Sequence, residues 1–405
     1  DKIVQKLQDE GFVEKIEDYE NQVGYCYRCK NVVEPYISKQ WFVKSQIADE
    51  AIKSVNEGNA KFYPSHWINS FNAWMRELKD WCISRQLWWG HQIPVFYCDC
   101  GHEWADENEP SQCPKCKGVK FTQDPDVLDT WFSSGLWPFS TLGWGNGNAL
   151  KGQKWNEGDL SEFYPNTMLI TGFDILFFWV ARMMFQSNNA LGELPFKDIY
   201  LHALVKDKDG KKMSKSSGNI IDPLDMIDEY SADILRFTLT ILCAQGRDVR
   251  MSDEQMVLSR NFTNKLYNAT KFLRMNVDKF SDFDENAIST KLGKYMLNRF
   301  KIAVNETRKA LDSYRFNDAA DRVYKFLWDE FCDWGIELSK ADKSAISELG
   351  MIFKESMKLL SPFMPFISEY LYHELSGTNL ENSQSIMISK YPKSKSCIID
   401  SPSLL

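Results

Sequence analysis

Apolar and polar residues follow two different patterns along the chain, and the change comes near residue 223. Before it, two short β-type runs at residues 167–171 and 199–205 flank a longer, largely apolar segment at residues 173–185. Short uninterrupted runs are typical of strands buried on both faces, and the longer segment is typical of a helix. This order predicts a parallel strand–helix–strand unit. Ligands of such sheets lie at the carboxyl ends of the strands, so we expect a site near Gly172.

After residue 223, apolar positions recur at the spacing of amphipathic helices. Asp222 and Pro223 are residue types preferred at an N-cap and at the first helical position. Four long helical stretches follow, at residues 253–279, 290–312, 316–340 and 344–376. Their lengths and short joints predict an antiparallel helical bundle.

The first 90 residues show a weaker pattern. Helices are predicted at residues 1–20, 42–60 and 70–87, with an extended stretch at residues 23–41. Residues 91–125 carry four close cysteines between Pro94 and Pro125, which indicates a compact insertion.

Composition restricts the class of protein. Of 405 residues, 43% are hydrophobic and 26% charged, which is typical of folded domains rather than disordered chains. The longest apolar run near the middle, residues 175–181, is far shorter than a membrane span. No apolar leader follows Asp1, so no signal peptide is expected. The net charge of −8 argues at first against nucleic acid as the main partner.

Paired cysteines are the first candidate chemistry. Two close pairs are separated by a short loop: Cys98, Cys100, Cys113 and Cys116. This is the pattern of a zinc ribbon with four thiolate ligands. The first pair is one residue shorter than usual, so His102 is an alternative ligand, and a disulfide is a second alternative. Cys26 and Cys29 form only half of such a site, with a plain reduced pair as the alternative.

A lysine-rich loop follows the second predicted strand. Five lysines, at positions 206, 208, 211, 212 and 215, outnumber two aspartates. Gly210 and Gly218 bracket the segment and permit movement. A mobile cationic loop at the carboxyl edge of a parallel sheet suits a polyphosphate, because ammonium groups can neutralise charge as pyrophosphate leaves. The alternative is a solvated, charged hairpin.

A second basic segment lies in the first long helix of the C-terminal part. Between residues 260 and 279, five basic residues and one acidic residue give a local charge of +4 inside a chain of −8. Such a helix suits phosphates, and asparagine side chains can reach base edges. The alternative is a solvated helix face.

The loop also carries a resemblance. Lys212-Met213-Ser214-Lys215-Ser216 matches the second signature of the class I aminoacyl-tRNA synthetases. Four further stretches resemble the valyl members of that family, at residues 83–91, 129–134, 136–144 and 171–182. Residues 175–178 are apolar where isoleucyl members are more polar, which favours valine. The resemblance is strong from about residue 20 to about residue 280 and weaker beyond.

The resemblance implies an α/β part followed by an all-α part. The α/β part would be the second half of a Rossmann-type parallel-sheet catalytic domain with a zinc-ribbon insertion, and an antiparallel helical bundle would follow. The implied divisions are a connective segment with the start of the catalytic half (1–90), the zinc ribbon (91–125), the catalytic half with the signature loop (126–252), the anticodon-binding helices (253–390) and a loose tail (391–405). The family's first signature, His-Ile-Gly-His, and its editing domain are missing. The chain is therefore expected to be a part that is inactive alone.

The resemblance also implies roles for individual residues. Lys212 and Lys215 would be catalytic and contact the phosphates as charge develops. The ATP-binding residues would be Gly172, Asp174, His202, Lys212, Met213, Ser214, Lys215 and Ser216. The walls of the valine pocket would be Trp131, Ile175 and Trp179. The residues that meet tRNA would be Arg85, Arg260, Asn261, Lys265 and Asn268. By their residue types alone, Asp174 is also a candidate helix N-cap, His202 a candidate core histidine, and the pocket residues candidate core side chains.

The implied activity is that of a valine–tRNA ligase. ATP, accompanied by Mg²⁺, would activate valine to valyl-adenylate, and the valyl group would pass to tRNA(Val); the Zn²⁺ would be structural. A cytoplasmic monomer without membrane attachment is expected. Two alternatives stay open: an isoleucyl-tRNA synthetase, and a non-catalytic RNA-binding protein built from a zinc ribbon and a helical bundle. The signature loop beside Gly172 and Asp174 favours an enzyme, because a binding module has no use for that combination.

Overall fold

The computed structural model describes residues 2–26, 29–145, 158–207, 209–213, 218–244 and 248–394. It contains two compact units. The first comprises Asp1–Val43 and Trp81–Val127, and the second comprises Lys44–Asp80 and Leu128–Leu405. Of the residues expected at the site, Ser214, Lys215 and Ser216 lie outside the described part of the chain.

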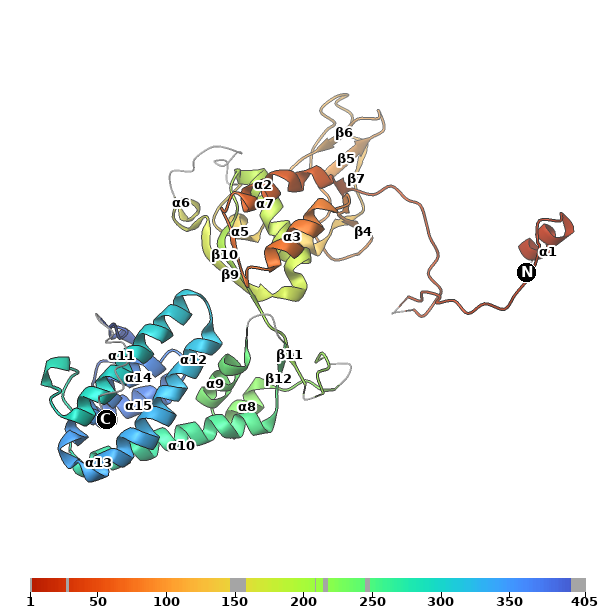
Figure 1. The fold of residues 1–405 in the computed structure, drawn as a ribbon. Coiled ribbons are helices and arrows are strands. Elements are labelled where there is room, and N and C mark those ends of the chain that lie inside the picture. The colour runs from red at the N-terminus through yellow and green to blue at the C-terminus, as the bar shows by residue number, and fades with distance from the viewer. Residues whose placement is uncertain are drawn as a thin grey trace. The chain divides into compact units, whose positions relative to one another are not determined.

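Short antiparallel strands build the first unit (Figure 1). Its three-stranded sheet has β5 (Val95–Cys98) between β6 (Glu103–Ala105) and β7 (Phe121–Gln123). A second pairing joins β1 (Phe42–Val43) to β3 (Trp81–Cys82). The other elements along these residues are α1 (Lys2–Asp9), β4 (Ser84–Arg85) and β8 (Val127–Leu128), with which the chain enters the second unit. Of the helix predicted over residues 1–20, only α1 forms.

A parallel sheet is the centre of the α/β part of the second unit. Its order is β2 (Lys61–Tyr63), β10 (Phe196–His202) and β9 (Asn166–Gly172), and all three strands are parallel. Ile199 and Leu201 of β10 are buried, as expected for a central strand. Helices α2 (Asp49–Asn56) and α3 (Trp67–Arg76) flank β2 in sequence, and α7 (Ala181–Leu191) lies between β9 and β10 (Figure 1). The predicted parallel strand–helix–strand unit is confirmed.

Two helix predictions need correction. The helix expected at residues 70–87 ends at Arg76, because Trp81 and Cys82 pair with β1 instead. This long-range pairing overrides the local helical pattern. The apolar segment after Gly172 is not one regular helix: a 3₁₀ turn (Phe173–Ile175) and a π-helical turn (Leu176–Val180) precede α7. Such π turns are frequent at functional sites.

Shorter elements precede strand β9 or lead from β10 to the C-terminal helices. They are α4 (Thr130–Gly135), α5 (Trp137–Ser140), α6 (Asp159–Phe163), β11 (Val205–Lys206), α8 (Pro223–Glu229), α9 (Ala232–Leu242) and β12 (Val249–Arg250). Strands β11 and β12 pair in parallel. Asp222 caps α8 by accepting from Leu224 N at 2.8 Å, which confirms the predicted start of that helix.

The rest of the second unit is a helical bundle, as predicted. Its helices are α10 (Asp253–Asn276), α11 (Lys291–Asp312), α12 (Phe316–Lys325), a π-helical segment (Phe326–Ile336), α13 (Glu337–Ala341), α14 (Ile346–Leu360) and α15 (Pro365–Ser376). Fully buried side chains from several of these helices fill one core, among them Phe262, Met296, Phe331 and Phe353. Within the described residues, no helix combines the length and apolar character that crossing a membrane requires.

Two side chains tie the bundle to the elements before it. Asp233 of α9 is buried and accepts from Phe366 N and Ile367 N, so it caps the N-terminus of α15 from another helix. Tyr314, between α11 and α12, donates to Asp198 Oδ2 of β10 at 2.8 Å. This hydrogen bond raises the pKa of Tyr314 to about 12. Charge-assisted hydrogen bonds thus join the bundle to α9 and to strand β10 of the sheet.

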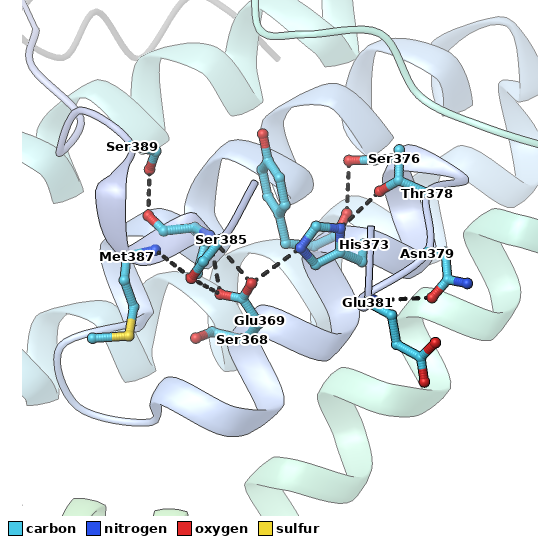
Figure 2. A network of polar contacts seen from close by, with 12 residues as sticks. Ser368, Glu369, His373, Ser376, Thr378, Asn379, Glu381, Ser385, Met387 and Ser389 are labelled. Carbon is cyan, nitrogen blue, oxygen red and sulfur yellow. Dashed lines mark hydrogen bonds and ion pairs between the residues drawn. The ribbon is translucent and has the colours of Figure 1, made fainter. Parts of the chain in front are cut away.

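A polar network fastens the segment that follows α15 (Figure 2). The buried His373 lies 3.0 Å from Glu369 Oε1 through Nε2 and 2.7 Å from Thr378 through Nδ1. The other oxygen of Glu369 accepts from Ser385 Oγ and from Ile386 N, each at 3.0 Å. Because the serine contacts the carboxylate rather than the imidazole, the group is a structural network and not a Ser–His–acid triad.

Ser231, in the second unit, has a backbone conformation that favours glycine. Ser231, the N-cap of α9, has φ 125°, and its hydroxyl accepts from Ile234 N only at 3.4 Å. Replacing Ser231 with glycine should relieve strain of about 1–3 kcal/mol. The weak cap and the greater freedom of unfolded glycine offset part of this gain.

We therefore expect Ser231→Gly to raise the free energy of local opening of α9 by about 0.5–1 kcal/mol. Hydrogen exchange of the α9 amides measures it. Ser252→Gly is the matched control, because Ser252 caps α10 from ordinary extended backbone at φ −142°. Faster exchange of the α9 amides in Ser231→Gly than in the unmodified protein would contradict the claim that the backbone at Ser231 is strained.

Candidate functional site

The carboxyl ends of β9 and β10 meet at the expected place. Register pairs His202 with Gly172, so the last residues of the two strands lie side by side. A Cβ added to Gly172 would lie 2.7 Å from Asp174 Oδ1 and 3.6 Å from His202 Cε1. A side chain at this position would displace the Asp174 carboxylate from its place over the strand end. The three residues expected at the nucleotide site are therefore neighbours.

The signature loop contributes a cation to the same edge. Lys212 Nζ lies 3.6 Å from Asp174 Oδ2, and both side chains are well exposed to solvent. An exposed pair of this kind stabilises the fold little, at most about 1 kcal/mol, so a charged ligand can separate it easily. His202 is exposed at the end of its strand, with Nδ1 2.8 Å from Ala203 O. This corrects the alternative that His202 is a core histidine.

Aromatic residues of α4 and of the turns after Gly172 face each other. The indole of Trp179 donates from Nε1 to Ser134 O at 3.1 Å, which fastens the π-helical turn to α4. The ring of Trp131 lies 6.1 Å from that of Phe178, and the ring of Trp179 lies 6.0 Å from that of Trp137. Trp131, Ile175 and Trp179 are all half-buried. They stay the predicted pocket residues.

A charged pair that sequence reasoning missed holds these elements in place. Asp129 caps α4 by accepting from Trp131 N at 3.4 Å, and its other oxygen lies 3.7 Å from Arg182 Nη1. Both side chains of the pair are about nine-tenths buried, and the Arg182 guanidinium lies 5.8 Å from the centre of the Phe178 ring. A desolvated pair is far more costly to break than an exposed one. The sequence Asp-Thr-Trp places an aspartate where a helix N-cap prefers one, and from this signal the capping role of Asp129 could have been predicted.

The four cysteines expected to bind zinc form one cluster. The Sγ atoms of Cys98, Cys100, Cys113 and Cys116 all lie within 4.8 Å of one another. The Cys98–Cys116 and Cys100–Cys113 sulfur distances are 3.6 and 3.8 Å. A tetrahedral Zn²⁺ with bonds of about 2.3 Å needs sulfurs about 3.8 Å apart. The donor set therefore fits a structural zinc ion, while His102 stacks on Trp104 at 5.7 Å instead of joining the cluster.

The backbone around the cluster tunes its thiols. Burial raises the pKa of the Cys113 thiol, but hydrogen bonds from the backbone of Cys116 and Lys115 and from neighbouring thiols outweigh burial and lower it to about 7. For Cys98 a backbone hydrogen bond lowers the pKa, yet burial and the neighbouring thiols raise it to about 12. Hydrogen bonds between the thiols contribute to both shifts. Zinc binding would release the thiol protons, because thiolates are its ligands.

The backbone bond between Cys26 and Lys30 matches the one between Cys113 and Lys117 in the four-cysteine cluster. Lys117 N donates to Cys113 O at 2.9 Å with Lys117 at φ 60°. In the same way, Lys30 N donates to Cys26 O at 2.9 Å with Lys30 at φ 60°. This shared geometry is suited to a metal ligand pair. Among the residues that the structure describes, the four-cysteine cluster of the first unit does not include Cys26 or Cys29, and their role as half of a metal site stays a prediction.

The residues expected to bind tRNA differ in their solvent exposure and in their side-chain partners. On α10, Arg260, Asn261 and Asn268 are exposed, and the latter two lie on one face, two turns apart. Lys265 is instead only partly exposed, because it pairs with Asp333 and lies 3.9 Å from the centre of the Trp328 ring. Arg85 donates to the backbone oxygens of Cys82 and Ser84. Arg260, Asn261 and Asn268 are thus the stronger candidates.

Comparisons with known proteins agree with this geometry. The family described as "tRNA synthetases class I (I, L, M and V)" matches residues 15–252, and "Anticodon-binding domain of tRNA ligase" matches residues 293–402. A valine–tRNA ligase of Wolinella succinogenes is 68% identical over 96% of this chain and 44% of its own length. One of Campylobacter jejuni is 66% identical over 98% of this chain and 45% of its own length. The chain thus spans less than half the length of these relatives.

Solved structures share the fold at low identity. A methionyl-tRNA synthetase of Mycobacterium tuberculosis in complex with methionyl-adenylate has a TM-score of 0.62 and 18% identity, over 86% of this chain and 65% of its own. A LeuRS from Agrobacterium radiobacter K84, in a ternary complex with tRNA and LeuAMS, has a TM-score of 0.61 and 20% identity, over 78% of this chain and 42% of its own. The match of the first family to more than half of the residues decides the classification. The chain belongs to the class I tRNA synthetases.

Proposed function

We propose that the enzyme containing this chain is a valine–tRNA ligase. The observation that carries the proposal is the meeting of Gly172, Asp174, His202 and Lys212 at the carboxyl edge of one parallel sheet. Relatives that are 66–68% identical over nearly the whole chain carry the name valine–tRNA ligase, which supports valine as the amino acid.

In the first step a carboxylate oxygen of valine attacks the α-phosphorus of ATP. The bond from that phosphorus to the oxygen bridging to the β-phosphate breaks, and pyrophosphate leaves with the electron pair. Negative charge therefore grows on the leaving group. The ammonium group of Lys212, and that of Lys215 by sequence, neutralises this charge and lowers the barrier. Mg²⁺ accompanies ATP as its usual counter-ion.

Asp174 gives the nucleotide its position. Its carboxylate, held over the strand end by the space at Gly172, accepts from the ribose hydroxyls of ATP. Binding the ribose separates Asp174 from Lys212, and the freed ammonium group turns to the phosphates. His202 borders the adenosine from the end of β10. Backbone amides beside Gly172 can approach the nucleotide closely because no Cβ intervenes.

Trp131, Ile175 and Trp179 select the amino acid by size. Rigid indoles fastened by Ser134 and by the Asp129–Arg182 pair exclude a longer side chain such as that of isoleucine. Threonine has nearly the shape of valine, and a pocket without a matching polar partner rejects an added hydroxyl poorly. Activation of some threonine is therefore expected.

In the second step a hydroxyl of the terminal ribose of tRNA attacks the carbonyl carbon of valyl-adenylate, and AMP leaves. The exposed face of α10 with Arg260, Asn261 and Asn268 binds the tRNA, and the four-cysteine cluster holds a structural Zn²⁺. We further propose that the enzyme works as a monomer in the cytoplasm, where translation uses its product.

Charging of tRNA with labelled valine tests the proposal. The full-length enzyme should form an ester between valine and tRNA(Val) only when ATP is present. Charging with isoleucine in preference to valine would assign it to the isoleucyl members instead. If the protein binds RNA but forms no ester when ATP is present, it is an RNA-binding protein and not a ligase.

A further inference from the structure

The chain leaves strand β11 through a tight turn organised by one carboxylate. Asp207 Oδ1 accepts from Lys211 N at 2.7 Å and from Asp209 N at 3.1 Å. The backbone closes the same turn, with Gly210 N donating to Asp207 O at 2.9 Å and Asp207 N donating to Lys211 O at 3.1 Å. Gly210 has φ 78°, a conformation that glycine adopts without strain. One side chain thus fixes the start of the signature segment.

The same carboxylate also holds the other end of that segment. Asp207 Oδ2 accepts from Asn219 Nδ2 at 2.7 Å, across twelve positions of sequence. The Asn219 amide further contacts Lys212 O at 3.4 Å. These hydrogen bonds, chiefly those from Asn219 and from Lys211 N, lower the pKa of Asp207. The group is therefore an anion at neutral pH, and its bonds are charge-assisted.

The bonds of Asp207 and Asn219 close the base of the loop that carries the signature lysines. Lys212 pairs with Lys206 as an isolated β-bridge, so its backbone is held from two sides. Its ammonium group reaches Asp174 at 3.6 Å. Moving the base by one ångström would move that group by a similar amount. Displacements of this size between catalytic groups cost about 100-fold in rate.

We propose that Asp207 and Asn219 form a clamp that positions Lys212 of the signature segment for adenylate formation. The clamp holds the loop by its two ends and contacts no substrate itself, so both are positioning residues. This inference rests on the proposed function. Because the clamp sets where the Lys212 cation stands in the transition state, its loss lowers the rate of activation and leaves the binding of valine unchanged.

Four substitutions in the full-length enzyme test the clamp. Asp207→Asn places an amide against the Asn219 amide, and Asn219→Asp places two carboxylates together. Asp207→Glu keeps the charge but moves the carboxylate by one methylene. Asp209→Asn is the matched control, since it removes the same charge while keeping the backbone N–H that Asp207 accepts.

The measurement is the rate of valine-dependent pyrophosphate exchange, with kcat separated from KM. We expect kcat to fall about 10- to 100-fold in each clamp variant, with KM for valine within about twofold. Asp209→Asn should stay within about twofold of the unmodified enzyme. The double variant Asp207→Asn/Asn219→Asp restores the cross-loop bond with the roles exchanged and should recover at least about fivefold over the weaker single variant.

The outcomes separate the clamp from the proposed function. If the unmodified enzyme exchanges pyrophosphate with valine but Asp207→Asn and Asp207→Glu match Asp209→Asn, the clamp is wrong. Equal losses in kcat and in valine affinity would show general damage rather than positioning and would also overturn it. Absence of valine-dependent exchange in the unmodified enzyme would overturn the proposed function first.

Discussion

Replacing Lys212 with alanine in the full-length enzyme should lower the rate of valyl-adenylate formation about 100-fold or more. The ammonium group lies at the carboxyl edge of the sheet beside Asp174, where the phosphates of ATP are expected. Removing a charge that acts on a developing anion costs about 3 kcal/mol, which corresponds to that factor. Because the interaction strengthens in the transition state, KM for valine should change by less than about threefold. Single-turnover formation of adenylate measures the effect.

Lys197→Ala is the matched control for this substitution. Lys197 is an exposed lysine near the amino end of β10, so the same charge is removed from the other end of a strand of the same sheet. Its rate should stay within about twofold of the unmodified enzyme. If the rate falls no more in Lys212→Ala than in Lys197→Ala, Lys212 does not take part in the reaction. Lys215, the second lysine of the signature, is expected to show at least as large a loss by its place in the motif.

Replacing Cys113 with serine should remove one equivalent of zinc from the full-length enzyme and open the ribbon. Binding of a structural zinc ion contributes about 10–16 kcal/mol in small zinc domains, and this free energy is largely free energy of folding. Few apolar side chains besides Phe96 are buried in the strands β5–β7, so the ion supplies much of what holds them. Elemental analysis measures the metal, and hydrogen exchange of the β5 amides measures the opening.

The same unit offers a control cysteine. Cys82 is half-buried in β3 and lies outside the four-cysteine cluster. Cys82→Ser should retain the zinc of the unmodified enzyme and leave exchange in β5 unchanged. Retention of zinc in Cys113→Ser, or the same loss in both variants, would contradict the assignment of the cluster.

The sequence alone was sufficient to predict the strands that contain continuous apolar runs. Strands β9 and β10 each contain a continuous apolar run, at residues 168–170 and 199–201, so the pattern is easy to recognise. Strand β2 was missed, because Lys61–Tyr63 is only three residues long and is held by pairing with β10 rather than by its own pattern. The helix expected at residues 70–87 failed for the same reason, since β3 forms by pairing with the distant β1. Local patterns cannot report such distant partners.

The candidate site divides in a similar way. Gly172, Asp174, His202 and Lys212 were predictable from motifs, because the motif letters and the rule for strand ends both point to one edge of the sheet. The contacts of Asp207 with Lys211 N and Asn219 could not be predicted from the sequence. They depend on a turn that brings a carboxylate to backbone amides, and no spacing in the sequence specifies that geometry.

The charge of the chain carries a similar lesson. The net charge of −8 first argued against nucleic acid, yet α10 exposes Arg260, Asn261 and Asn268 on its surface. Electrostatic attraction acts within about 10 Å at ordinary salt, so a local basic surface matters more than the sum. Lys265 is the exception, because its ion pair with Asp333 neutralises its charge.

The most direct test of valine activation at this site is amino-acid-dependent pyrophosphate exchange by the full-length enzyme with valine, threonine and isoleucine compared. We predict the highest kcat/KM with valine, a weaker but measurable value with threonine, and the lowest value with isoleucine. Exchange that isoleucine supports better than valine, or no exchange above background with any of the three, would contradict a valine-activating site built from Trp131, Asp174, Trp179 and Lys212.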